Sequence, residues 1–234
     1  MAKVKDYFDK WSNSYCTVSK RDEYYIFLRW IFSVILKKLP KKKNAGILDL
    51  GTGGGRVIIA IHEKFKDAEY FGLDISTGLL SKAKKALKKR KINASLIESR
   101  MSKIKLEDNS IDYVVSNFAI HHCASKENMI KEVFRVLKSN GIFIFGDMYE
   151  KQDKKHLKEV EKLRKKHPGL AKKFDQDIYN AWEGTKAQWK LNHPREYHIT
   201  PKQFSELLKK HGFKKIEIIR SVHKQIVVIK AEKL

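Results

Sequence analysis

Short apolar segments alternate with amphipathic segments through the middle of the chain. The segments ILDL, YFGLD, YVVS and IFIF are apolar over nearly consecutive positions, which is typical of strands that are covered on both faces. The predicted strands cover residues 45–50, 69–74, 94–97, 111–116 and 142–145, and the predicted helices between them cover 56–65, 77–91 and 126–138. This alternation predicts an α/β fold with a parallel sheet and helices on both faces.

The end of the chain follows a different pattern. A helix is expected to begin at Thr200, because Pro201 and Gln203 complete a capping box with proline at the first helical position, and Gly212 should end it. Two apolar strands, residues 215–220 and 225–229, follow with few residues between them. They should therefore form an antiparallel hairpin at the edge of the sheet.

Length and composition favour one domain over residues 1–234. The charged segment 151–195 is predicted to be a helical lid insertion over the carboxyl ends of the strands, where open parallel sheets bind ligands; a solvated excursion with its own small core is the alternative.

Two cysteines, Cys16 and Cys123, are too few for a disulfide framework and lack zinc-site spacing. Without a signal-like or membrane-spanning run, a cytoplasmic location is expected.

The chain is strongly basic, with 50 Lys and Arg against 27 Asp and Glu and a formal net charge of +23. Such a charge favours weak electrostatic binding to polyanions, RNA or an anionic membrane. The basic residues are mostly lysines spread over every predicted helix, whereas bidentate phosphate or base recognition favours arginine clusters. A general lysine bias of the surface is therefore the competing interpretation.

The segment ILDLGTGGGR, residues 47–56, runs from a strand through a glycine-rich turn into a helix. Gly51, Gly53 and Gly55 let the backbone turn sharply and approach a ligand closely at the positive end of that helix. The spacing is not that of a dinucleotide fingerprint, because position 56 is Arg, and the Lys-Ser/Thr pair of a triphosphate loop is missing. Asp74 ends the next strand, where a carboxylate can accept both hydroxyls of a ribose. Taken singly, these residues also suit a tight turn and a helix cap.

The order strand, glycine-rich turn, helix, strand and acid resembles that of class I S-adenosylmethionine-dependent methyltransferases. The chain is most similar to the small-molecule branch of this family, which includes the ubiquinone and menaquinone C-methyltransferases. LDLGTGGGR is similar to the first motif, FGLDIS to the second, and LEDNSIDYVVSNFAIHH, residues 106–122, to the fourth-strand motif. DYFDKWSNSY, residues 6–15, resembles the segment that folds over the cofactor. The resemblance implies a Rossmann-like, seven-stranded, mostly parallel sheet with a terminal antiparallel hairpin, and residues 1–40 as an N-terminal helical cap.

The resemblance also implies roles for individual residues toward S-adenosylmethionine. Asp49 and the turn Gly51, Thr52, Gly53 and Gly55 would hold the methionine part, Asp74 the ribose, Ile75 one face of the adenine and Asn117 the cofactor side of the cleft, with Tyr15 covering the cofactor. Arg100 stands where the family often has an acid that accepts from the adenine amino group. Arginine cannot accept that bond, so Glu98, Ser99 or the backbone of Arg100 and Met101 would take its place.

Methyl transfer from a sulfonium needs a positioned nucleophile, and a general base only for some acceptors. His121 and His122, after the fourth predicted strand, and Tyr149, after the fifth, are candidates for that catalytic base; the histidines are favoured by their ordinary pKa but also suit helix-start packing. Tyr7, Trp11, His122 and Tyr149 are candidates for the acceptor pocket, and Tyr7, Trp11 and Tyr15 equally suit an ordinary apolar helix face. His193 and His198 suggest no metal site.

The leading interpretation is methyl transfer to a small organic acceptor. RNA methylation is the alternative that the charge suggests, although SNFAIHH lacks the proline pair typical of exocyclic-amine modification. A third alternative is a non-catalytic cofactor-binding protein at a membrane surface, with the aromatic helix at residues 24–38 lying on anionic lipid. The competing expectation for that helix is that it packs on the sheet.

Overall fold

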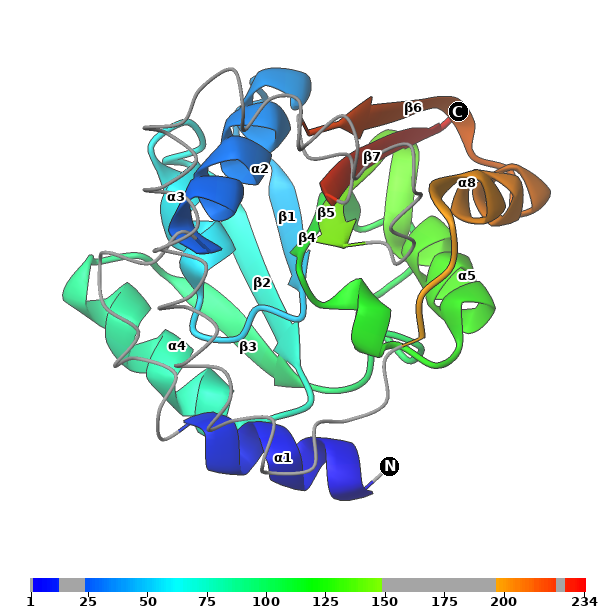
Figure 1. Cartoon of the computed structure of the whole chain (residues 1–234). Helices are drawn as coiled ribbons and strands as arrows, with labels where there is room; N and C mark the ends of the chain where they lie inside the picture. The colour runs from blue at the N-terminus through cyan, green and yellow to red at the C-terminus, as the bar shows by residue number, and fades with distance from the viewer. Residues whose placement is uncertain (1, 13–23, 149–196, 222–225) are drawn as a thin grey trace, which may run out of the picture.

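The computed structural model describes residues 2–12, 24–148, 197–221 and 226–234 (Figure 1). Seven strands form one sheet in the order β3-β2-β1-β4-β5-β7-β6. Their bounds are β1 Gly46–Leu50, β2 Glu69–Asp74, β3 Ala94–Glu98, β4 Ile111–Asn117, β5 Leu137–Met148, β6 Lys214–Arg220 and β7 Ile226–Lys233. β1 to β5 pair in parallel, and β7 pairs antiparallel with both β5 and β6. The predicted Rossmann-like sheet with a terminal hairpin is confirmed.

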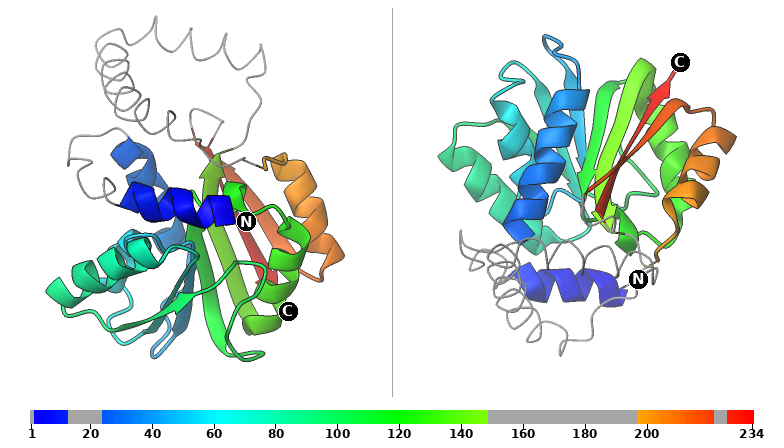
Figure 2. Two further views of the ribbon diagram at one scale, coloured as in Figure 1. Left: turned by 90° about the horizontal axis from the view of Figure 1, so that it is seen from below. Right: turned by 45° about the horizontal axis from the view of Figure 1, so that its top comes forward.

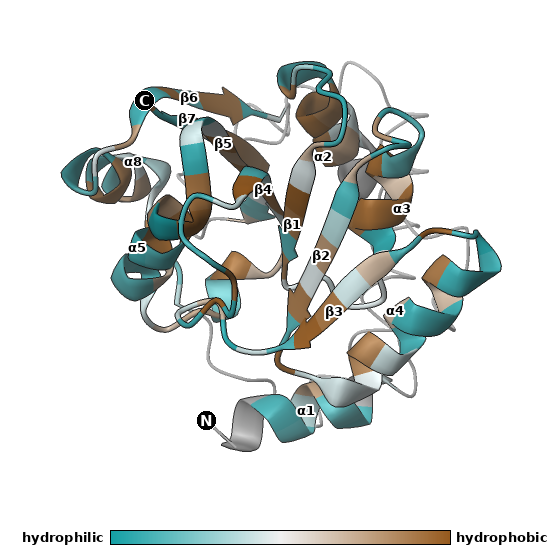
Figure 3. Cartoon of the chain, turned by 180° about the vertical axis from the view of Figure 1, so that it is seen from behind, coloured by the Kyte–Doolittle hydropathy of each residue, from teal (hydrophilic) through white to brown (hydrophobic). Residues whose placement is uncertain are grey.

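Helices cover both faces of this sheet (Figures 1 and 2). One face carries α2 Tyr24–Lys38, α3 Arg56–His62 and α4 Thr77–Lys89, and the other carries α5 Lys126–Val136 and α8 Pro201–Lys210. Alternate residues of the central strands supply the two cores: Ile47, Tyr113 and Val115 face the first layer, whereas Leu48 and Val114 face the second. Burial on both faces explains the continuous apolar runs, which Figure 3 shows along the strands.

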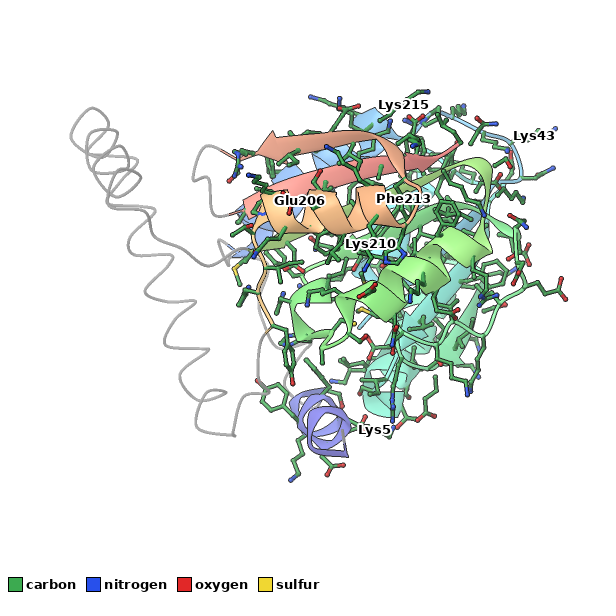
Figure 4. The ribbon with its side chains drawn as sticks, turned by 90° about the vertical axis from the view of Figure 1, so that its right-hand side faces the viewer. Lys5, Lys43, Glu206, Lys210, Phe213 and Lys215 are labelled. Atoms are coloured by element: carbon green, nitrogen blue, oxygen red, sulfur yellow. The ribbon has the colours of Figure 1, made fainter. Side chains whose placement is uncertain are left out.

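The helix α1, Ala2–Ser12, lies across one end of the sheet rather than on a face (Figure 2). It marks the end at which the parallel strands finish. Lys5 on α1 lies at the opposite end of the molecule from Lys43, which precedes β1, and from Lys215, near the start of β6 (Figure 4). The carboxyl ends of the parallel strands therefore gather beneath α1.

The second helix packs on the sheet, as one of the two interpretations of its sequence expected. Ile31, Ile35 and the following Leu39 are fully buried in the same core as β1 and β4. Contact is close: a Cβ added to Gly146 of β5 would lie 2.4 Å from Cγ2 of Ile31. The buried face of α2 is thus used inside the protein. None of the helices in the described ranges has both the length and the apolar character that crossing a bilayer requires.

Element boundaries differ from the predicted ones mainly at β5. The helix predicted over 126–138 ends at Val136, and the strand predicted over 142–145 already begins at Leu137. Leu137 is fully buried and pairs with Ile111 of β4, so the tertiary position of an apolar side chain overrides helical spacing. At α8 the capping box is present as predicted, since Thr200 accepts from the backbone of Gln203 and the Gln203 side chain accepts from the backbone of Thr200.

Candidate active site

The turn after β1 is held against the end of β2. The backbone N–H groups of Gly51 and Thr52 both donate to the carbonyl of Leu73, at 2.8 and 3.0 Å. Gly51, Gly53 and Gly55 have φ values of 72°, 51° and 80°, which side-chain-bearing residues rarely adopt. At Gly51 space is also missing, because an added Cβ would lie 2.4 Å from Cβ of Ala119. The sequence pattern GxGxG therefore reflects both conformation and a close approach of two loops.

A buried carboxylate without a partner lies just before this turn. Asp49 is fully buried, and neither of its oxygens accepts a hydrogen bond from the described residues. Burial raises the pKa of Asp49 to about 7; the neighbouring Thr52 hydroxyl opposes this shift, and the charge of Asp74 adds to it. Two further buried oxygens close by, Oγ1 of Thr52 and Oδ1 of Asn117, are likewise without hydrogen-bond partners in the described ranges. Unpaired buried acceptors of this kind are costly unless a ligand satisfies them.

The carboxylate of Asp74 faces the same turn from the end of β2. Its Oδ2 accepts from the backbone N–H of Gly53 at 2.9 Å, and its Oδ1 from that of Ser76 at 2.9 Å. Burial nevertheless raises the pKa of Asp74. Each carboxylate oxygen can accept more than one hydrogen bond, so each keeps capacity for a hydroxyl group.

These groups come from three neighbouring strands and fit one ligand. Asn117 extends β4 beside the turn, because Ser116 pairs with Leu50 of β1. The unpaired acceptors of Asp49 and Asn117 suit an ammonium group, and Asp74 suits a pair of ribose hydroxyls. S-adenosylmethionine carries both features, so the residues present fit the cofactor that the sequence motifs imply.

The predicted adenine-side residues lie at the rim of this arrangement. The carbonyl of Ile75 accepts from Nζ of Lys5 at 3.2 Å. Met101 is half-buried, and its Cε would lie 2.8 Å from a Cβ added to Gly51, so its side chain borders the turn. Arg100 is exposed, and its carbonyl accepts from the backbone of Lys103 in the loop after β3.

The helix α1 is fastened to the first turn of α4, next to Asp74. Oδ1 of Asp9 accepts from the Ser76 hydroxyl at 2.5 Å and from the backbone N–H of Gly78 at 3.0 Å. Lys5 adds an ion pair with Glu98 at 2.9 Å. Burial opposes ionisation of Asp9, but the hydrogen bonds from Ser76 and Gly78 hold its pKa below the ordinary value. Sequence reasoning missed Asp9, because its partners lie far along the chain.

Replacing Asp9 by alanine should loosen α1 without unfolding the sheet. Two hydrogen bonds to a carboxylate are lost, so amide protection in residues 2–12 should fall by about tenfold in hydrogen–deuterium exchange. Asp6→Ala is the matched control, since Asp6 is exposed on the same helix. The ionised form of Asp9 is the one that docks, so the protection should also fade as the pH drops through its lowered pKa. Equal protection in both variants would contradict this role.

Aromatic side chains of α1 reach the segment after β4. Phe8 contacts the ring of His122 edge-on, with centroids 5.0 Å apart, and also packs against Tyr7, which is buried. Phe8 thus contacts both Tyr7 and His122, two of the residues predicted for the acceptor pocket. Trp11 belongs to α1, but its side chain, like Tyr15 and Tyr149, lies outside the described residues, and so does the segment 151–195.

The two candidate histidines, in the short helix η1 Ile120–His122, have different surroundings. Their rings are 4.0 Å apart, yet His121 turns toward β5, where its Nδ1 lies 2.6 Å from Oδ1 of Asp147. The backbone N–H of His121 donates to the other oxygen of Asp147 at 2.9 Å. Asp147 was not among the candidates from the sequence; an acid directly after the apolar part of a central strand is the signal that could have identified it.

Comparisons with known proteins agree with this geometry. A family model described as a methyltransferase domain matches residues 41–215. A malonyl-[acyl-carrier protein] O-methyltransferase of Marinomonas sp. (strain MWYL1) is 30% identical over 141 residues, which cover 60% of this chain and 50% of that protein. A demethylmenaquinone methyltransferase of Listeria welshimeri is 27% identical over 142 residues, 59% of each chain.

The matched regions thus span half to three fifths of these two relatives. Among solved structures, a SAM-dependent methyltransferase from Aquifex aeolicus superposes with a TM-score of 0.61 at 18% identity, covering 87% of this chain and 89% of that one. That likeness supports the fold. The family match, which extends over most of the chain, and the fit of the site to the cofactor agree. The chain belongs to the methyltransferase-domain family and shares the fold of an S-adenosylmethionine-dependent methyltransferase.

Proposed function

We propose that this enzyme methylates a small organic acceptor that binds above the carboxyl ends of β4 and β5. The observation that carries the proposal is the course of α1. The helix is fastened to Ser76 after β2, and its Phe8 contacts His122 after β4. A cover that spans the strand ends suits a small ligand better than a folded RNA. The names of the relatives, which refer to a malonyl-carrier and a demethylmenaquinone substrate, also support an organic acceptor.

The cofactor would lie above β1 and β2, with its ends held by different groups. Asp49 and Oδ1 of Asn117 would accept from its ammonium, and the glycine turn after β1 would border the chain that joins ammonium and sulfur. Asp74 would accept from the ribose hydroxyls, and Ile75 and Met101 would border the adenine. Tyr15, which lies outside the described residues, stays a prediction for the cover of the cofactor.

When bound, S-adenosylmethionine supplies an electrophilic methyl group on a sulfonium. The task of the chain is then to align the acceptor with the methyl group, to exclude water and to take a proton where the acceptor carries one. His121 and His122 are the proton acceptors proposed for this step. Tyr7, Trp11 and Tyr149 are proposed to border the acceptor.

The cytoplasmic location and weak electrostatic binding to RNA or anionic membranes belong to the same proposal. Cys123 is a free thiol, which suits a reducing compartment. On α4, Lys84, Lys85, Lys88 and Lys89 are exposed and would supply a sequence-independent attraction to polyanions. Such an attraction should disappear at moderate salt.

A screen of metabolite fractions for uptake of labelled methyl groups identifies the acceptor. We expect the label to enter a compound of low molecular mass. Label in RNA, together with salt-resistant and sequence-selective RNA binding in a gel-shift assay, would overturn the proposal of a small acceptor.

Replacing Asp74 by alanine should weaken binding of S-adenosylmethionine by about tenfold or more, because two charge-assisted hydrogen bonds to the ribose are lost. Isothermal titration calorimetry measures this effect, and thermal unfolding verifies that the variant is folded. Asp67→Ala is the control, since Asp67 is exposed in the turn before β2. Unchanged affinity in the folded Asp74 variant would refute the ribose role.

A further inference from the structure

A cluster of buried polar groups lies on the acceptor side of the site, at the ends of β4 and β5. His121 and Asp147 are only 7% and 2% exposed. Together with Lys126, Tyr197 and His198 they line a small cavity beside the start of α8. The cofactor groups of β1 and β2 do not use this cluster. Its location, next to the strand ends where the acceptor is proposed to bind, suggests a part in the reaction.

The hydrogen bonds of Asp147 fix the orientation of the His121 ring. Oδ2 accepts from the backbone N–H of His121 at 2.9 Å, and Oδ1 accepts from that of Met148 at 2.8 Å and faces Nδ1 of the ring at 2.6 Å. A carboxylate with these partners is an acceptor, so Nδ1 carries the hydrogen. The second ring nitrogen, Nε2, is then the one that can take a proton.

Other groups packed around the pair complete its environment. The ring of His198 is stacked on that of His121, with centroids 5.7 Å apart and planes 10° apart, and the ring of His122 lies 4.0 Å away. The ammonium of Lys126 donates to the carbonyl of Cys123 at 2.6 Å, and burial lowers its pKa. Tyr197 donates its backbone N–H to the carbonyl of His121 at 2.8 Å. The imidazole of His121 thus contacts two further rings, and its backbone carbonyl is held by Tyr197.

We propose that Asp147 is the positioning residue that makes His121 the proton acceptor of the methyl transfer. The inference rests on the proposed function. As the acceptor's nucleophilic atom forms its bond to the methyl carbon, the carbon–sulfur electron pair passes to sulfur, and the acceptor's proton passes to Nε2 of His121. The resulting imidazolium lies beside the carboxylate of Asp147, which stabilises it. The 2.6 Å contact between Nδ1 of His121 and Oδ1 of Asp147 is the observation that assigns this role to His121.

The first test reads the ring nitrogens directly and needs no acceptor. In long-range ¹H–¹⁵N spectra of the full chain labelled with ¹⁵N-histidine, the signals of His121 are identified by their loss in His121→Gln. We expect the hydrogen of neutral His121 on Nδ1 rather than on Nε2, and we expect Asp147→Asn to abolish this preference. Hydrogen on Nε2 in the unaltered chain would overturn the proposal.

The second test separates catalysis from folding. With the acceptor found in the methyl-uptake screen, Asp147→Asn should lower kcat by about 100-fold, the scale of a general base, and change the pH profile of kcat, while the affinity for S-adenosylmethionine stays within about twofold. Asp147→Glu should restore part of the rate. An unchanged kcat and pH profile in Asp147→Asn would overturn the proposal.

Asp112→Asn is the matched control. Asp112 is also a buried aspartate, but it lies at the other end of β4, where it accepts from Lys42, Lys138 and the backbone of Gly46. This variant should lose stability and keep the pH profile of kcat. The same change of profile in Asp112→Asn would show that only stability is at issue and would overturn the role of Asp147. Failure of the unaltered chain to bind S-adenosylmethionine in calorimetry would instead refute the proposed function.

Discussion

With asparagine at position 49, we expect the affinity for S-adenosylmethionine to fall by about 100-fold at pH 8 and to become nearly independent of pH. In the unaltered protein, burial raises the pKa of Asp49 to about 7, and its two oxygens have no hydrogen-bond partner among the described residues. A bound ammonium favours the ionised carboxylate and lowers that pKa. Affinity should therefore rise as the pH increases through about 7, with release of a proton below that value.

Calorimetry in buffers of different ionisation enthalpy measures both the affinity and the released proton. Asp49→Asn suits this experiment because the change is isosteric, and the remaining amide oxygen can still face the hydroxyl of Thr52. Asp112→Asn, at the opposite end of the sheet, should retain the pH dependence. A pH-independent affinity in the unaltered chain, without proton release, would contradict the role of Asp49.

The same substitution should stabilise the protein without cofactor. Because the pKa of Asp49 is raised on folding, the folded state holds a proton that the unfolded state has lost between about pH 4 and pH 7. Stability contributed by this group therefore declines as the pH rises through that window. The thermal midpoint of Asp49→Asn should exceed that of the unaltered chain at pH 8 by roughly 5 °C or more.

Replacing Gly51 by alanine should abolish detectable cofactor binding and destabilise the fold by about 2 to 4 kcal/mol. The residue has φ of 72°, and the added Cβ would lie 2.4 Å from Cβ of Ala119 and 2.8 Å from Cε of Met101. Met101 can move its side-chain end, whereas Ala119 can yield only through its backbone. To relieve the contact with Ala119, the turn after β1 must move away from the segment after β4. Asp49 and the turn would then no longer lie in the right position relative to Asn117 to bind the cofactor together.

Gly212→Ala is the matched control for backbone strain. Gly212 has φ of 90° at the end of α8, where the added Cβ would lie 3.0 Å from the ring of Phe134. This variant should lose a similar amount of stability and bind S-adenosylmethionine normally. Denaturant unfolding and calorimetry distinguish the two glycines. Normal binding by Gly51→Ala would show that the close approach to Ala119 is dispensable.

The central sheet could be predicted because its signals are local. Consecutive apolar residues indicate strands such as β1 and β4, and the box formed by Thr200 and Gln203 indicates the start of α8. Two short apolar strands with few residues between them likewise indicated the C-terminal hairpin. The boundary at Leu137 could not be predicted, since pairing with Ile111 rather than helical spacing decides it.

The candidate site likewise contains residues that could be identified from the sequence and residues that could not. The glycine turn and Asp74 follow a strand directly, so their location at the carboxyl edge is visible in the sequence. Asp9 and Asp147 could not be assigned, because their meaning depends on partners that the fold alone brings near: Ser76 for Asp9 and His121 for Asp147. Likewise, sequence alone made His121 and His122 equivalent, and only the packing of Phe8 on one and Asp147 on the other separates them.

The structure of the enzyme crystallised with S-adenosylmethionine tests the central claim most directly. We expect the ammonium within hydrogen-bonding distance of the Asp49 carboxylate, the ribose hydroxyls on Asp74, and the methyl group directed toward the side of His121 and His122. A cofactor whose ribose avoids Asp74 and whose ammonium lies away from Asp49 would contradict the account.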